Sequence, residues 1–222
     1  MKNVALFKNR YDAGKQLASE LPEYKNQKDL IILGLPRGGI PVAYEIALEL
    51  NIPLDIFTVR KLGVPGQNEL AMGAVASGGV RVLNEDVIAA LRIPNDVIDK
   101  ITVIEQEELS RRERLYRKGL PPFNVENKIV MLVDDGLATG ATMRAAINAV
   151  KMLKPAKVMI AVPIASRQAY QLLKSEVDFM ECLFTPLFFE GVSRWYHDFA
   201  QLIDSEVKRL LHDAALRNFN RD

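Results

Sequence analysis

The chain has 222 residues, of which 49% are apolar and 26% are charged, and this length and composition suit one globular domain. The formal net charge of +1 gives no global sign of a nucleic-acid partner, and the single cysteine, Cys182, excludes an intramolecular disulfide. No uncharged apolar run approaches the ~20 residues that cross a bilayer, and no signal-peptide pattern opens the chain, so we expect a cytoplasmic protein without membrane contact.

Short apolar runs alternate with helical patterns along the chain. The run LIILG at 30–34 is apolar throughout, as in a strand buried on both faces, and helical apolar spacing follows at 40–50. This alternation predicts a parallel α/β sheet with helices on both faces. Strands are predicted at 30–34, 54–61, 72–84 (one or two, around a Gly-Gly turn), 128–133, 157–164 and 178–184, and helices at 40–50, 141–153, 167–174 and 198–217.

One segment interrupts the alternation. Residues 85–119 are charged and helical in pattern, and the pair Pro121 and Pro122 follows them. We interpret 85–120 as a helical insertion within a single domain that spans 1–222. The basic run at 111–119 follows several acids, which favours a solvated helix face over a nucleic-acid site.

The stretch VDDGLATGAT has the features of a phosphate loop. It follows the predicted strand 128–133, and parallel α/β sheets bind ligands at the carboxyl ends of their strands. Gly136 and Gly140 permit a tight turn and close approach to a ligand, while Thr139 and Thr142 offer hydroxyls. The next helix would present free N–H groups to an anion. The stretch matches neither the Walker pattern nor GxGxxG.

Two carboxylates, Asp134 and Asp135, stand directly before this loop. Like charges ~4 Å apart repel by about 4 kcal/mol at an effective dielectric of ~20, so both acids would oppose a bare phosphate. The conflict disappears if the acids meet sugar hydroxyls or a divalent cation such as Mg²⁺. The pattern therefore favours a sugar phosphate, and the alternative is a turn whose acids merely stabilise a helix N-terminus.

The stretch VMLVDDGLATGAT resembles the phosphoribosyl pyrophosphate (PRPP) signature of the type I phosphoribosyltransferases. The whole chain is also similar to a group of bacterial proteins known only as predicted phosphoribosyltransferases. The resemblance implies that fold, with a Rossmann-like core and helices on both faces. It implies that Asp134 and Asp135 hold the ribose hydroxyls. The 5′-phosphate would be bound by Gly136, Leu137, Ala138, Thr139, Gly140 and Thr142.

A second anion loop follows the strand at 30–33. Gly38 and Gly39 allow close backbone approach, and Arg37 brings a positive charge with several donors. The resemblance implies that Pro36, Arg37, Gly38 and Gly39 form the pyrophosphate loop, with a non-proline cis peptide near Arg37–Gly38. The alternative is a simple turn between strand and helix.

A basic pair ends the second predicted strand. The resemblance implies that Arg60 and Lys61 meet the pyrophosphate, and the alternative is surface charge. The following residues, 62–71, contain Gly63, Pro65 and Gly66 and are predicted to form a mobile loop that closes over the site.

An acceptor site is expected in the C-terminal hood, residues 185–222, since a variable hood binds the acceptor in this family. Its aromatic side chains could stack a planar base, and the alternative is that they pack the terminal helix onto the sheet. These residues are Phe188, Phe189, Trp195 and Tyr196.

The resemblance implies a Mg²⁺-dependent enzyme that moves the 5-phosphoribosyl group from PRPP to a nitrogenous base and releases pyrophosphate. Its catalytic residues would be Asp134, Asp135, Arg60 and Lys61, with Mg²⁺ held mainly through PRPP near the two acids. No membrane or nucleic acid is expected as a partner, and exposed aromatic or insertion surfaces would suit a homodimer. The alternatives are a non-catalytic PRPP-binding regulator and another phosphoribosyl-processing enzyme.

Overall fold

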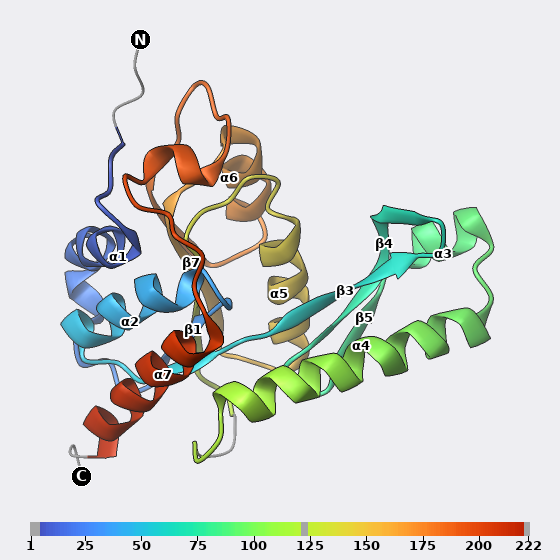
Figure 1. Cartoon of the computed structure of the whole chain (residues 1–222), viewed down its shortest axis with the longest axis horizontal. Helices are drawn as coiled ribbons and strands as arrows, with labels where there is room; N and C mark the ends of the chain where they lie inside the picture. Colours follow the sequence, from blue (N-terminus) through green and yellow to red (C-terminus); the bar gives the residue numbers. More distant parts are fainter. Residues whose placement is uncertain (1–4, 121–123, 220–222) are drawn as a thin grey trace.

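In the computed structural model, which describes residues 5–120 and 124–219, a five-stranded parallel sheet forms the centre of the body (Figure 1). This confirms the α/β fold with a parallel sheet. Residue Gly34 pairs with Val133, so two neighbouring strands end side by side and the loops that follow them meet at one edge. In spatial order the strands are β2 (Leu54–Ile56), β1 (Leu30–Gly34), β6 (Ile129–Val133), β7 (Lys157–Ile164) and β8 (Phe179–Phe184).

Helices cover both faces of this sheet, as the continuous apolar strands predict. Successive strand residues point to opposite faces, so Ile32 packs into one apolar cluster while Ile31 and Leu33 pack into another. All three side chains are buried, as expected for strands that lie between two layers of helices. The first cluster includes residues of α1 (Arg10–Ser19), α2 (Gly39–Leu50) and α7 (Asp204–Phe219), and the second includes residues of α5 (Ala141–Met152) and α6 (Arg167–Lys174).

A second, smaller unit projects from the body, and we call residues 59–116 the arm (Figure 1). A three-stranded antiparallel sheet and two helices share an apolar cluster that includes Leu62, Met72 and Leu109. The predicted helical character of 85–119 is confirmed, whereas Pro121 and Pro122 lie outside the described residues. The elements are β3 (Val59–Val64), β4 (Gln67–Ala76), β5 (Val80–Leu83), α3 (Glu85–Leu91) and α4 (Asn95–Tyr116).

Three sequence predictions are wrong in detail. The strand expected at 54–61 is broken at 57–58, and its second half belongs to the arm. The mobile loop expected at 62–71 is a β-hairpin, with Gly66 in the left-handed region at its turn. Apolar residues in β3 and β4 pack against α4, and the turn-rich sequence does not reveal these contacts.

The third error concerns helix boundaries at both ends of the chain. The terminal helix begins at Asp204, six residues later than the predicted start at Asp198, which leaves 198–203 irregular beside the sheet edge. Helix α1 was not predicted at all, although the side chain of Asn9 caps it by accepting a hydrogen bond from the N–H of Asp12 at 2.9 Å. Short 3₁₀ helices occur at η1 (Pro22–Tyr24) and η2 (Val192–Trp195).

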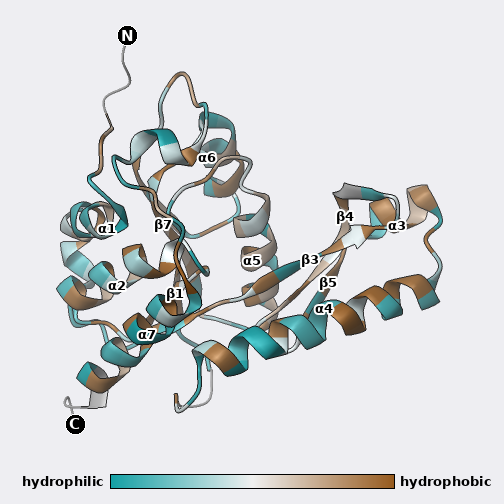
Figure 2. Ribbon diagram, viewed as in Figure 1, coloured by the Kyte–Doolittle hydropathy of each residue, from teal (hydrophilic) through white to brown (hydrophobic). Residues whose placement is uncertain are grey.

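The central strands and helix α4 differ in hydropathy. Figure 2 shows apolar residues along the central strands and a mixed pattern along α4. On α4, Val103 and Ile104 are 56% and 62% exposed. Within the described residues, no helix is both long enough and apolar enough to cross a membrane.

Candidate functional site

Two adjacent carboxylates stand at the end of β6. The backbone N–H of Asp135 donates to Oδ1 of Asp134 at 2.9 Å, and the hydroxyl of Tyr196 donates to the backbone oxygen of Asp135 at 2.6 Å. Burial raises the pKa of Asp134 well above its usual range, and the charge of Asp135 adds to the rise. Burial also raises the pKa of Asp135, while the nearby guanidinium of Arg10 opposes that rise. The fold therefore holds two carboxyls in a poorly solvated position, which is a common mark of a functional site.

The loop after β1 touches this acid pair directly. A Cβ on Gly38 would lie 2.0 Å from Oδ2 of Asp135, and one on Gly39 would lie 2.5 Å from the backbone oxygen of Val133. Only glycine permits such contact between the two loops. The non-proline cis peptide expected near Arg37–Gly38 lies one bond earlier, between Pro36 and Arg37.

The loop after β6 is fixed against the end of β7. The N–H of Leu137 donates to the oxygen of Ile164 at 2.9 Å, and the hydroxyl of Ser166 donates to the oxygen of Ala138 at 2.7 Å. Gly140 takes a left-handed conformation with φ of 75°, and α5 begins at the next residue. The loop therefore leads into a helix N-terminus at the same sheet edge, which is the arrangement that binds phosphates.

Several small and hydroxyl-bearing residues of this loop are exposed at the sheet edge. Ala138 and Thr139 are exposed between β6 and α5, and Thr142 is exposed in the first turn of α5. The hydroxyl oxygen of Thr139 accepts a hydrogen bond from the N–H of Ala141 at 3.3 Å.

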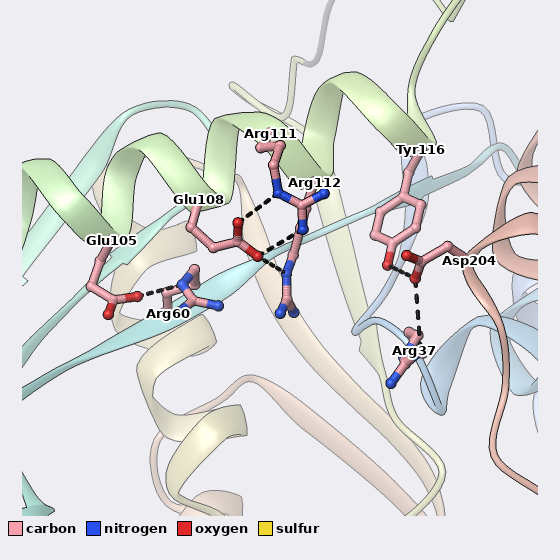
Figure 3. Close-up of polar contacts among 8 residues, drawn as sticks. All are labelled: Arg37, Arg60, Glu105, Glu108, Arg111, Arg112, Tyr116 and Asp204. Carbon is pink, nitrogen blue, oxygen red and sulfur yellow. Dashed lines mark hydrogen bonds and ion pairs between the residues drawn. The ribbon is translucent and has the colours of Figure 1, made fainter.

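Two arginines predicted to bind the anion, Arg37 and Arg60, are paired with carboxylates from α7 and α4 (Figure 3). Arg37 Nη1 lies 3.8 Å from Oδ1 of Asp204, which also accepts a hydrogen bond from the hydroxyl of Tyr116 at 2.6 Å. Arg60 Nε donates to Oε2 of Glu105. An anionic ligand that binds these arginines must therefore exchange or rearrange existing ion pairs.

The two basic residues expected to contact the pyrophosphate together point to opposite faces of one strand. Arg60 and Lys61 are consecutive residues of β3, not the end of a strand of the parallel sheet. Side chains of consecutive strand residues point to opposite faces, so the two do not face one ligand from this strand. Arg60 is half-buried against α4, whereas Lys61 is exposed.

A cavity of about 410 Å³ lies where the loops meet the segment after η2. Its lining includes Arg37, Gly38 and Asp135, which the sequence predicts as site residues, and further residues that the sequence does not predict. The asparagine cap marks Arg10 as the start of a helix, but no local pattern connects it with a carboxyl 125 residues away. The cavity is lined by Arg10, Arg37, Gly38, Asp135, Val192, Phe199, Gln201 and Leu202.

The hood aromatics predicted to bind an acceptor do not form one stacking surface. Trp195 and Tyr196 are only 9% and 5% exposed and share an apolar cluster with Phe7 and Ile164. Phe189 is partly buried against the same cluster, whereas Phe188 is 83% exposed. Trp195 and Tyr196 therefore serve in core packing. They pack on the N-terminal segment and β7, and not between α7 and the sheet as the alternative prediction had it. Phe199 borders the cavity in their place.

A divalent cation fits this site only in partnership with a ligand. Among residues 5–120 and 124–219, no group of three or more His, Cys, Asp or Glu side chains could hold a metal ion. Mg²⁺ commonly binds through one or two carboxylates plus phosphate oxygens of a substrate. The pair Asp134 and Asp135 beside two glycine-containing loops is compatible with that mode.

Comparisons with known proteins agree with this geometry. The sequence profile of the family described as "Phosphoribosyl transferase domain" matches residues 2–197. A Mycobacterium tuberculosis protein named "Putative phosphoribosyl transferase" is 42% identical over 216 residues, which cover 97% of this chain and 48% of that protein. The chain thus spans about half the length of this relative.

Two further proteins are similar over most of their own length. The "Bifunctional protein PyrR" of Pelotomaculum thermopropionicum is 30% identical over 135 residues, covering 59% of this chain and 68% of that protein. The crystal structure of the protein TT1426 from Thermus thermophilus superposes with a TM-score of 0.83 at 38% identity, covering 94% of this chain and 99% of the other.

Proposed function

The chain belongs to the phosphoribosyl transferase family, and from this premise we propose that it transfers the 5-phosphoribosyl group of PRPP to a nitrogenous acceptor and releases pyrophosphate. One observation carries the proposal most strongly. The glycines of the loop at 36–39 touch the acid pair that precedes the loop at 136–142, so closely that a Cβ on Gly38 would lie 2.0 Å from Oδ2 of Asp135. A ligand with a phosphate, a sugar and a pyrophosphate would match this order of groups along one sheet edge.

Each part of PRPP has a proposed set of residues. The 5′-phosphate meets the loop from Gly136 to Thr142 and the N-terminus of α5. Asp134 and Asp135 accept hydrogen bonds from the ribose hydroxyls. Arg37 and the backbone of 36–39 meet the pyrophosphate, and Arg60 supplies further positive charge once it leaves Glu105.

In the proposed reaction, the bond between C1 of the ribose and the pyrophosphate oxygen breaks, and a bond between C1 and the acceptor nitrogen forms. The acceptor nitrogen loses a proton, and pyrophosphate leaves with the bonding electron pair. The sugar carries positive charge at C1 in the transition state, which Asp134 and Asp135 favour by their negative charge. Arg37 favours the negative charge that develops on the leaving group, and the loops fix the reactants in position.

Mg²⁺ is the proposed cofactor, and it would be held mainly through the oxygens of PRPP, with Asp134 and Asp135 nearby. When bound, it would neutralise charge on the pyrophosphate. The chain's own residues bind and orient the sugar and the two phosphate groups.

The acceptor would enter through the cavity beside Phe199. Val192, Phe199 and Leu202 give this side an apolar wall, and Gln201 adds an amide that can donate and accept hydrogen bonds. A planar nitrogenous compound suits such a wall. A PRPP-binding protein without transfer activity is a second candidate, favoured by the burial of Trp195 and Tyr196, which removes the expected stacking surface.

PRPP binding is the first test of the proposed function. We expect calorimetric titration with PRPP and Mg²⁺ to show saturable binding, and the ligand to raise Tm by mass action. No heat and no shift at millimolar PRPP would contradict both candidates. A screen of purines, pyrimidines and small amines for pyrophosphate release then separates them, because a regulator binds PRPP without turnover.

The acid pair gives a sharper test by mutation. The double variant Asp134→Asn with Asp135→Asn should lose PRPP affinity by at least about tenfold, because charge-assisted hydrogen bonds to the ribose contribute about 1.5–3 kcal/mol each. The matched control is Asp178→Asn, whose carboxylate accepts a hydrogen bond from the N–H of Val158 at the opposite edge of the sheet. Wild-type affinity in the double variant would show that the acids are not ribose ligands.

A further inference from the structure

Arg10 is buried at the edge of the sheet, although arginine is rarely buried. It is the first residue of α1 and is 9% exposed. A buried charge is costly unless partners compensate it. Its partners therefore indicate what the side chain does.

Three contacts hold the guanidinium in place. Nε donates to Oδ2 of Asp135 at 2.7 Å, and Nη1 donates to the backbone oxygen of Ala200 at 2.9 Å. The guanidinium carbon lies 3.7 Å from the centre of the Phe199 ring, within the range of a cation–π interaction. One side chain from α1 thus joins an acid after β6 to the segment that borders the acceptor side of the cavity.

The carboxylate of Asp135 is enclosed on two sides. Arg10 bonds to Oδ2, and the same oxygen lies against the backbone of Gly38. The side chain of Asp135 is only 14% exposed. A carboxylate has about four lone-pair sites, so pairing with Arg10 leaves capacity for a sugar hydroxyl.

We propose that Arg10 is a positioning residue for the ribose of PRPP: it orients Asp135 and ties the segment 199–202 to it. This inference rests on the proposed function. Asp135 is not free to turn toward solvent while the guanidinium holds Oδ2, and it keeps one orientation toward the sugar. Through Phe199 and Ala200, the same side chain sets the distance between the ribose acid and the acceptor side of the cavity.

A merely structural ion pair would behave differently from a positioning one. The chain offers such a pair for comparison: Arg117 donates to both carboxylate oxygens of Asp55 at 2.9 and 2.8 Å. Side-chain exposure is 18% and 12% in this pair, against 10% and 14% for Arg10 and Asp135. The two arginines are therefore matched in burial and partner, and only Arg10 bonds to a proposed ribose ligand.

Binding of substrate fragments tests the role of Arg10. Wild type, Arg10→Gln, Arg10→Lys and Arg117→Gln are titrated with PRPP, ribose 5-phosphate and pyrophosphate, each with Mg²⁺, and Tm is recorded for each protein. We expect Arg10→Gln to weaken PRPP and ribose 5-phosphate about ten- to hundredfold, with pyrophosphate changed less than about threefold. Arg10→Lys keeps the charge but not the planar fork, so it should show a smaller loss for the same two ligands. Arg117→Gln should lower Tm and leave the affinity for ribose 5-phosphate within about twofold.

Coupling between the two residues provides a second measurement. In an Asp135→Asn background, Arg10→Gln should add less than about a twofold loss of ribose 5-phosphate affinity, because the residue acts through Asp135. Wild-type PRPP affinity in both Arg10 variants, or equal losses for pyrophosphate and ribose 5-phosphate, would overturn the positioning role alone. Failure of the wild-type chain to bind PRPP would instead overturn the proposed function, and the role of Arg10 with it.

Discussion

At the scale of single residues, Asp134 shows a conflict between stability and binding. Its carboxyl sits beside that of Asp135 in a poorly solvated position, and its pKa is raised by burial and by its neighbour's charge. A raised pKa means that the folded state holds a proton more tightly than the unfolded state does. The free energy of unfolding therefore falls as pH rises through the folded pKa. The ligand-free protein is destabilised by a charge that a sugar or a cation would compensate.

Asp134→Asn should for this reason stabilise the ligand-free protein at neutral pH. We expect Tm at pH 8 to rise by about 2–4 °C, which corresponds to about 1 kcal/mol for a chain of this size. The amide keeps an oxygen to accept the hydrogen bond from the N–H of Asp135. The advantage should shrink as pH is lowered, since the wild-type carboxyl then takes up its proton. Calorimetric scans from pH 8 to pH 5 check this, and a variant that melts below wild type at pH 8 contradicts it.

At the scale of secondary-structure elements, α4 and α7 carry the carboxylates that pair with Arg60 and Arg37. Glu105 on α4 pairs with Arg60, and Asp204 at the start of α7 pairs with Arg37 (Figure 3). Tyr116, also on α4, donates to the same Asp204 oxygen, so the two helices meet at this acid. These acids keep the arginines ordered without a ligand, but they compete with any anion that the arginines bind.

Asp204→Asn should strengthen pyrophosphate binding. The pair with Arg37 is partly exposed, with side chains 45% and 38% accessible, so its contribution is at most about 1 kcal/mol and the expected gain is about two- to fivefold. The gain should decrease as salt is added. The matched control on the same helix is Asp213→Asn, whose carboxylate is 40% exposed and pairs with Arg209 at 3.2 Å. Calorimetric titration of pyrophosphate with Mg²⁺ measures both, and weaker binding in Asp204→Asn would mean that the acid supports the anion site.

At the scale of the whole molecule, the arm is joined to the body at both ends of its chain segment. Residues 57–58 link β2 to β3, and the side chain of Arg117, directly after α4, bonds to Asp55 in β2. The arm has its own apolar cluster, so its internal packing alone does not fix its place beside the sheet. Apolar packing joins the arm to the body as well, since Tyr116 is buried in the cluster of α2 and α7, and Ala76 and Val80 are buried in the cluster of α5. The ion pair and the bond from Tyr116 to Asp204 add polar contacts to this attachment.

Arg117→Gln should therefore weaken the attachment of the arm. Charge-assisted hydrogen bonds in a partly buried pair predict a loss of about 2 kcal/mol in the free energy of unfolding, or about 4–8 °C in Tm. Asp55 is left without its bidentate partner, which adds to the loss. Thermal unfolding of the variant measures the effect, and an unchanged Tm would mean that the arm is held by its other contacts.

The sequence predicted the local parts of the site more completely than the contacts between them. Gly38 is recognisable as a loop glycine, but its reason for being glycine is a carboxylate after another strand. Trp195 and Tyr196 have the composition of a stacking surface, yet Phe7 and Ile164 bury them. An aromatic residue suits a base pocket and a core equally well, so only its neighbours decide between the two.

The sequence by itself determined the parallel α/β class, the two glycine-containing loops and the acid pair, because apolar runs, glycines and adjacent charges are patterns within a few residues of one another. Tertiary structure decided that Arg10 meets Asp135 across 125 residues, and that Arg60 meets Glu105 across 45. It also decided that 62–71 is a hairpin of the arm. These pairings depend on which strands lie side by side and on burial after folding, and no short stretch of sequence carries that information.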